Sequence, residues 1–150
     1  MSLTFALKVA RVAGCLSLAA PVFAQDIKGQ AAFEAHCSAC HAIGGVGTPG
    51  LAPPLNRPAF WAGFADAPAY VSGVLTHGLS GTITAAGQQY FGLVMPAQSA
   101  LPPEELALAA SYVLRDLGGL EAEVTPETLS AAAATKMTAA DLRALRPLSE

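Results

Sequence analysis

Two long segments rich in glycine and proline limit how this chain of 150 residues can fold. They span residues 42–58 and 79–101, and they separate three stretches with helical periodicity or helix-start signals at 28–37, 66–78 and 101–118. Loops of this length are uncommon in a domain of only ~100 residues. The pattern predicts a small all-α fold with three main helices, whose loops wrap around a large group that is not protein.

A short motif identifies that group. Cys37 and Cys40 are separated by two small residues, and His41 follows directly. This Cys-X-X-Cys-His spacing is the signal for attachment of a c-type haem. One helical turn places both thiols on the same side, where they can add to the two vinyl groups of the porphyrin. We therefore predict one covalent haem c, with His41 as an iron ligand.

Other uses of paired cysteines fit less well. A structural zinc site needs four ligands, and beyond residue 24 the chain has only these two cysteines and three histidines, two of them adjoining the cysteines. A thioredoxin-like redox pair needs a βαβ context, which the pattern lacks. A disulfide between Cys37 and Cys40 would close a tight, strained loop.

The iron needs a second axial ligand, and Met95 is the predicted one. It lies in the second long segment, is followed by Pro96 and precedes the last haem-domain helix, so its loop can fold over the distal face. A thioether is a soft ligand that raises the reduction potential. His77 is the alternative, although a histidine beside Gly78 also fits a helix C-terminal cap. His36 is too close to the attachment site to reach the distal face.

Residues 1–24 resemble a signal peptide for export. Lys8 and Arg11 precede a short apolar run at 12–20, and small residues stand at the −3 and −1 positions before a predicted cleavage after Ala24. The run is too short to span a bilayer. We expect a periplasmic mature protein without a stable membrane span; an uncleaved N-terminal anchor is the alternative.

The charge balance restricts the partners. The formal net charge is −3, and removal of the signal would leave six basic against eleven acidic residues, or −5. No basic run indicates nucleic-acid binding. Residues 25–118 contain only three basic residues, Lys28, Arg57 and Arg115. Redox partners should therefore dock on a small apolar patch, with little dependence on salt. Candidates for that patch are Leu51, Ala62 and Ala97.

The composition changes after Gly119. The segment is rich in alanine and threonine and has few large apolar residues, and helix starts are predicted at Thr125 and Thr138. We predict a haem-binding domain at 25–119 and a helical C-terminal extension at 120–150.

These residues together resemble the class I c-type cytochromes, single-haem electron carriers, over about residues 26–118. Gly29 and Phe33 stand eight and four residues before the first motif cysteine. In the family this glycine lets the last helix cross closely, and Tyr112 matches the aromatic residue of that last helix.

The resemblance also implies roles in the loops. Pro53 lies twelve residues after His41, where a family proline offers its carbonyl to the N–H of the proximal histidine and tunes its basicity. Leu55 matches a residue that packs on the haem. Met95 matches the distal methionine of the family.

Residues 74–96 are similar to cytochrome domains that serve periplasmic dehydrogenases, although Phe91 replaces an expected small polar residue. The resemblance to these cytochromes implies that the protein is an electron carrier rather than an enzyme. It would pass single electrons from a dehydrogenase donor to an oxidase or cytochrome acceptor, either free or as a dehydrogenase subunit. The alternative is a haem enzyme or gas-binding protein, which would apply if Met95 left the sixth iron position open.

Overall fold

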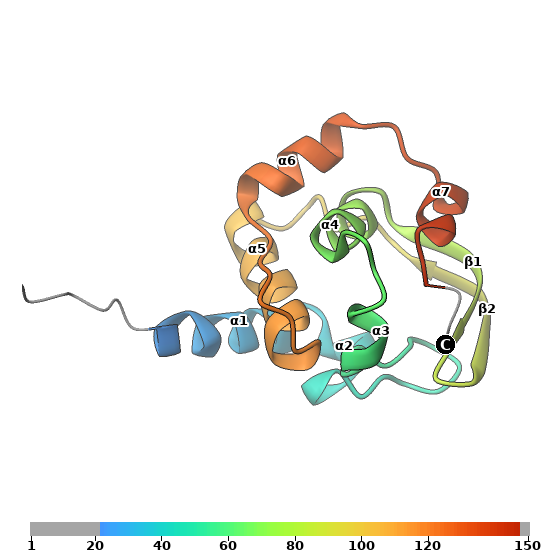
Figure 1. Ribbon diagram of the computed structural model, residues 1–150, viewed down its shortest axis with the longest axis horizontal. Coiled ribbons are helices and arrows are strands. Elements are labelled where there is room, and N and C mark those ends of the chain that lie inside the picture. The colour runs from blue at the N-terminus through green and yellow to red at the C-terminus, as the bar shows by residue number, and fades with distance from the viewer. Residues whose placement is uncertain (1–21, 148–150) are drawn as a thin grey trace, which may run out of the picture.

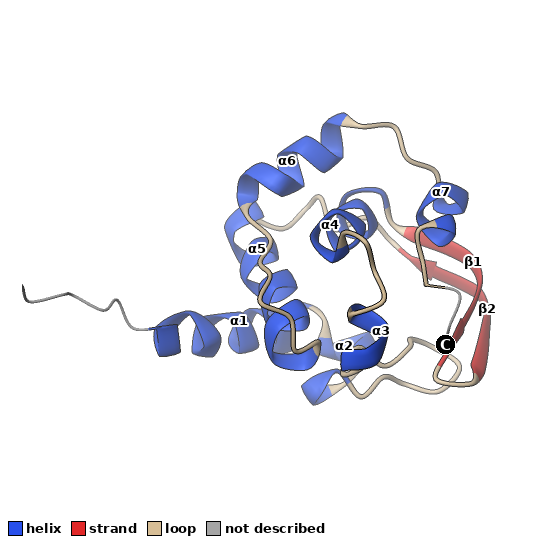
Figure 2. Cartoon of the chain, in the orientation of Figure 1, coloured by secondary structure: helices blue, strands red, loops and turns tan. Residues whose placement is uncertain are grey.

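The computed structural model describes residues 22–147, so most of the predicted signal peptide lies outside the described part. Helices surround a central helix, and a hairpin of two strands closes one side (Figures 1 and 2). The elements in chain order are α1 (Val22–His36), α2 (Ser38–His41), η1 (Ile43–Gly45), α3 (Pro58–Trp61), α4 (Ala67–His77), β1 (Leu79–Ala85), β2 (Gln88–Met95), α5 (Pro103–Tyr112), η2 (Val113–Leu117), α6 (Pro126–Ala134) and α7 (Ala139–Ala144).

The three predicted main helices are present as α1, α4 and α5, the last continued by η2 as one π-helical turn. Helix α4 starts as its sequence indicates, because the carboxylate of Asp66 accepts the backbone N–H of Ala69 at 2.9 Å. Helix α4 ends at His77, and Gly78, with a φ of +77°, is its C-cap. No helix among residues 22–147 is long and apolar enough to cross a bilayer.

Helices α1 and α5 cross at Gly29. A Cβ atom at this position would lie 3.0 Å from the carbonyl oxygen of Leu108 and 3.1 Å from Cβ of Tyr112. One turn further, the buried ring of Phe33 packs 5.4 Å from the ring of Tyr112, centroid to centroid. The crossing therefore depends on the missing side chain, as the resemblance implies.

A Gly29→Val variant should accordingly lower the free energy of unfolding by about 1–3 kcal/mol, because the added methyl groups would push α5 away. The measurement is denaturant unfolding of the haem-loaded protein. Ala31→Val puts the same side chain on an exposed position of α1 and should cost about 0.5 kcal/mol or less. Equal losses in the two variants would show that the close crossing is unimportant.

The prediction of irregular structure for residues 79–101 is wrong over its first part. Strands β1 and β2 pair antiparallel, from Leu79 opposite Met95 to Ala85 opposite Gln88. The glycines that suggested a loop lie at special backbone positions: Gly87 ends the turn, and Gly92 belongs to a bulge where the register shifts, both with positive φ. Met95, the last residue of β2, therefore lies beside Gly78 at the end of α4.

The extension shares the main hydrophobic core. Val124, Leu129 and Leu142 are buried in the same cluster as Phe33 and the apolar side of α4. Thr125 and Thr138 each cap a helix through reciprocal bonds with the third residue, as predicted. The extension has few large apolar residues, but most of them are buried in the main core or pack against it.

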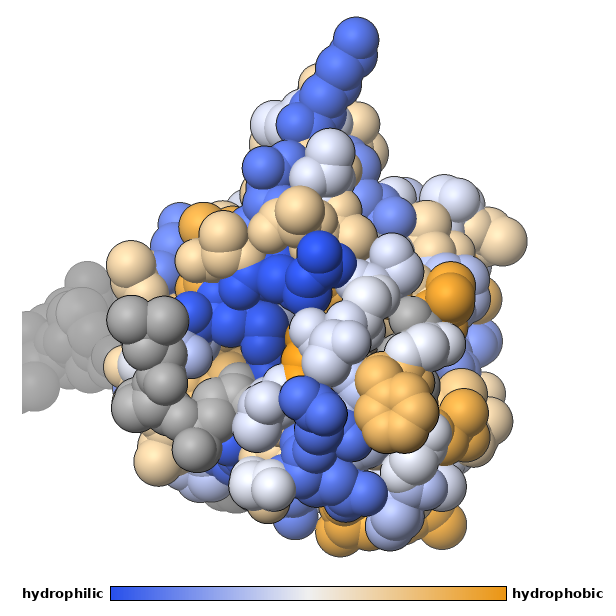
Figure 3. All heavy atoms as spheres, turned by 90° about the vertical axis from the view of Figure 1, so that its right-hand side faces the viewer, coloured by the Kyte–Doolittle hydropathy of each residue, from blue (hydrophilic) through white to orange (hydrophobic). Residues whose placement is uncertain are grey.

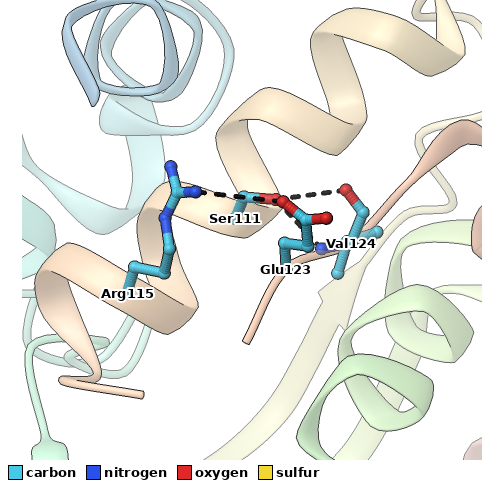
Figure 4. A network of polar contacts seen from close by, with 4 residues as sticks. All are labelled: Ser111, Arg115, Glu123 and Val124. Carbon is cyan, nitrogen blue, oxygen red and sulfur yellow. Dashed lines mark hydrogen bonds and ion pairs between the residues drawn. The ribbon is translucent and has the colours of Figure 1, made fainter. Parts of the chain in front are cut away.

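A polar contact fixes the start of the extension on α5 (Figure 4). The hydroxyl of Ser111 accepts the N–H of Val124 at 2.9 Å and donates to its carbonyl at 3.1 Å. The guanidinium of Arg115 forms an ion pair with the carboxylate of Glu123 at 4.0 Å. After leaving the end of η2, the chain therefore folds back and packs its first residues against α5 and η2.

Candidate haem site

The two motif cysteines lie within one helical turn. Cys37 precedes α2, and its carbonyl accepts the backbone N–H groups of Cys40 at 3.2 Å and His41 at 2.9 Å. Cys37 is half-buried against the core, whereas Cys40 is exposed. Burial raises the pKa of the Cys37 thiol to about 11, and Cys40 adds to the rise. The Cys37 thiol is therefore neutral near pH 7.

His41 is held as a neutral ring in one orientation. Its side chain is buried, with 8% exposed, and its Nδ1 lies 3.0 Å from the carbonyl oxygen of Pro53. A carbonyl only accepts hydrogen bonds, so Nδ1 carries the proton and Nε2 carries the lone pair of the neutral ring. Burial lowers the pKa of His41, while the bond to Pro53 opposes this shift. A neutral imidazole of fixed orientation is what a metal ion requires.

The loop that presents the Pro53 carbonyl is fixed by its own backbone. Leu55 donates its N–H to the carbonyl of Gly45 at 2.7 Å and accepts the indole N–H of Trp61 at 2.6 Å. Gly47 has a φ of +79°, and a Cβ there would lie 2.6 Å from the backbone nitrogen of Pro54. The loop is therefore compact, with Leu55 packed against the main core.

Trp61 is a residue of this site that sequence reasoning missed. It lies in the short helix α3, is buried, and stacks with Phe64 at 5.7 Å between ring centroids. The cluster of three aromatic residues after Pro58 was the available signal. Only the tertiary structure shows that the indole holds the Leu55 carbonyl.

Met95 ends the hairpin as a half-buried side chain that packs against the main core. The chain beyond it is held to α4, because Gln98 donates its backbone N–H to the carbonyl of Leu75 at 2.7 Å. Pro96 and Gln98 form a further bond, from the side-chain amide to the carbonyl at 2.7 Å. Met95 is thus supported on both sides along the chain.

The rival ligands are engaged elsewhere. His77 directs Nε2 toward the carbonyl of Thr135 at 2.9 Å and Nδ1 toward Thr76 and Gly73. The Nε2 atom of His36 lies 2.6 Å from the carboxylate oxygen Oε2 of Glu105 in α5, within hydrogen-bond distance. Each ring would have to give up these contacts to reach a metal.

The arrangement combines two thiols one turn apart, a neutral buried imidazole with a free Nε2 lone pair, and a thioether on a separate hairpin. These are the donors of a protein that binds haem covalently, so the residues present fit that group.

Residues 27–115 match the profile of the family described as Cytochrome c, and the chain belongs to this family. Its members bind haem c covalently, typically one in single-domain proteins, so the predictions of the cofactor and of a class I cytochrome are confirmed. The chain is a haem-based electron-transfer protein, from a family that generally carries electrons rather than acting as an enzyme. No curated protein sequence matches the chain at a significant level.

Proposed function

We propose that this protein is an exported, periplasmic carrier of single electrons that attaches its haem through Cys37 and Cys40 and binds the iron through His41 and Met95. The observation that carries the proposal is the 3.0 Å contact between His41 Nδ1 and the Pro53 carbonyl. This contact leaves the Nε2 lone pair of a buried ring available as a metal ligand, directly after Cys40 in the chain.

When bound, the haem supplies reversible one-electron oxidation and reduction at its iron. The chain then has three tasks. Cys37 and Cys40 fix the porphyrin edge, His41 keeps its ring orientation through Pro53, and Met95 provides a soft ligand that favours the reduced state. Because both ligands are held by the fold, little rearrangement is expected when an electron arrives or leaves.

We further propose that the protein is not itself an enzyme and that it serves a periplasmic dehydrogenase, as its acceptor or its cytochrome subunit, with an oxidase or another cytochrome receiving the electron. The domain division proposed with it is 25–119 for the haem and 120–150 for the extension. Exposed apolar side chains after the haem motif support docking without a ring of lysines: Ile43, Val46 and Leu51.

Docking through apolar contacts should make electron transfer nearly insensitive to salt. Raising the ionic strength from ~0.01 to ~0.15 M shortens the Debye length from ~30 to ~8 Å and should change the second-order rate with the physiological donor by less than about threefold. The measurement is stopped-flow oxidation and reduction across a salt series. A rate that falls steeply with salt would mean that charged groups dominate docking.

The test of the proposal is the visible absorption spectrum of the periplasm-expressed protein, oxidised and reduced, with and without carbon monoxide. Low-spin bands, a weak far-red iron–sulfur band and no response to carbon monoxide are the expected results. High-spin bands with ready carbon monoxide binding would instead favour the open-site enzyme or gas-binding protein. Mass spectrometry of the mature chain tests cleavage after Ala24.

A further inference from the structure

The last helix of the extension and the residues that follow it bind the hairpin that carries Met95. Helix α7 contacts both β1 and α4, and Figure 1 shows the extension running from the end of α5, past α4, to the hairpin. The guanidinium of Arg143 donates to the carbonyl of Ser80, and that of Arg146 donates to the carbonyl of Thr84 at 3.0 Å. Two charged side chains therefore form hydrogen bonds with the backbone of β1, one near each end of the strand.

The same segment, α7 and the residues just after it, is also anchored on the core. Leu142 is fully buried, and a Cβ atom at Gly73 of α4 would lie 2.7 Å from its Cδ2. Arg146 also donates to the hydroxyl of Tyr70 at 3.0 Å, and its guanidinium lies 4.9 Å from the ring centroid of Phe60. Arg146 thus joins the aromatic cluster of the core to β1.

The other end of the extension is held to the core as well. Helix α6 packs on α4 and α5, with Leu129 buried between them and the rest of the core. The ring of His77, at the end of α4, contacts the carbonyl of Thr135 after α6. With the Ser111–Val124 contact, the extension is attached to α5 and α4 before it reaches the hairpin.

The hairpin needs outside support. A two-stranded hairpin is marginally stable by itself. Among the residues whose burial is described, Ile83, Ala85 and Tyr90 form a small cluster separate from the main core. Two large apolar residues of β2 remain exposed, Phe91 at 75% and Val94 at 73%. Figure 3 shows the face that carries the hairpin, where hydrophobic side chains lie among hydrophilic ones. Among residues 22–147, β2 pairs with no strand other than β1, so contacts that hold β1 also restrain Met95 at the end of β2.

We propose that the C-terminal extension is a strap that keeps Met95 in place, with Arg143 and Arg146 as positioning residues. The proposal rests on the proposed role of Met95 as an iron ligand. Hydrogen bonds with a charged donor are about twice as strong as neutral ones, and here both are made to a strand with one neighbouring strand. Loosening them should free the hairpin without changing any residue of the haem site.

Titration of the oxidised protein with imidazole measures how often Met95 leaves the iron. Imidazole can bind only while Met95 is displaced, so its apparent dissociation constant is the intrinsic one divided by the displaced fraction. The Arg143→Ala/Arg146→Ala double variant should bind imidazole about tenfold more tightly than the wild type, which corresponds to ~1.4 kcal/mol. Arg143→Ala alone is a milder variant that should give a smaller gain, should the double variant fail to fold.

Leu129→Ala is the matched control, because it destabilises the packing of α6 on the core and leaves both arginines intact. At equal loss of thermal stability, it should tighten imidazole binding less than the arginine variants do. Hydrogen exchange of the β1 and β2 amides should likewise become faster in the arginine variants, and much less so in the control. Equal changes of imidazole affinity and amide exchange in the arginine variants and in Leu129→Ala would overturn the proposal. The arginines would then contribute only to the general stability of the fold.

Met95→Ala separates this proposal from the one on which it rests. If wild-type protein binds imidazole as tightly as Met95→Ala does, Met95 is not the ligand, and the proposed function itself fails. If Met95→Ala binds imidazole far more tightly than the wild type while the arginine variants match the wild type, that result would support Met95 as the iron ligand. It would contradict the proposal that the extension holds Met95 in place. Tight binding by Met95→Ala and intermediate binding by the arginine variants supports both.

Discussion

A Cys37→Ala/Cys40→Ala variant should accumulate without covalently bound haem. Neither thiol of the motif remains to form a thioether, and the exposed Cys40 and half-buried Cys37 are the only cysteines among the described residues. Haem staining after denaturing electrophoresis should fall to background, and the mass of the chain should match the polypeptide alone. Thermal stability should fall as well, because a ligand that binds only the folded state stabilises it.

Ser38→Ala is the matched control for this variant. Ser38 lies between the two cysteines, and its hydroxyl donates to the carbonyl of Glu34 at 2.6 Å, so the change removes a local bond and keeps the Cys-X-X-Cys-His spacing. It should retain full covalent haem. Covalent haem in the double cysteine variant would rule out these two residues as the attachment site, whatever the family of the chain.

Met95→Ala should convert a closed iron site into an open one. The far-red iron–sulfur band should disappear, the ferrous protein should bind carbon monoxide, and the reduction potential should fall by on the order of 0.2 V, within the ~0.8 V range set by axial ligands. The reason is that the thioether stabilises ferrous iron more than water or a harder ligand does. Spectroscopy and potentiometric titration measure all three changes.

Val94→Ala is the control for Met95→Ala. Val94 precedes Met95 in β2 and is exposed, so its truncation should leave the band, the closed site and the potential unchanged. A band that survives in Met95→Ala would show that another side chain binds the iron. His77→Ala would then identify or exclude the rival, which the structure places against Thr135 instead.

Local sequence signals account for much of the fold and most of the candidate site. The spacing of Cys37, Cys40 and His41 reflects one helical turn, and Asp66, Thr125 and Thr138 cap helices through bonds to residues only three positions away. The Pro53 contact was expected from a family resemblance and not from local chemistry. Such features are readable because each partner lies close in sequence or at a spacing that recurs in related proteins.

The hairpin and the strap could not be read in this way. The alternation in β1 and β2 is interrupted by a bulge at Gly92, and several exposed residues obscure its apolar face. The contacts of Arg143 and Arg146 with β1, and of Trp61 with Leu55, depend on where distant segments lie.

The sequence by itself thus determined the cofactor, the thiols and imidazole expected to hold it, and the main helices, because covalent spacing and helix periodicity are local. Only the tertiary structure decided that residues 79–95 form a hairpin and that the extension joins the core and grips this hairpin. An arginine donor or a small helix residue such as Gly73 fits many surroundings equally well in sequence. Its role follows from which backbone oxygen or side chain the folded chain brings against it.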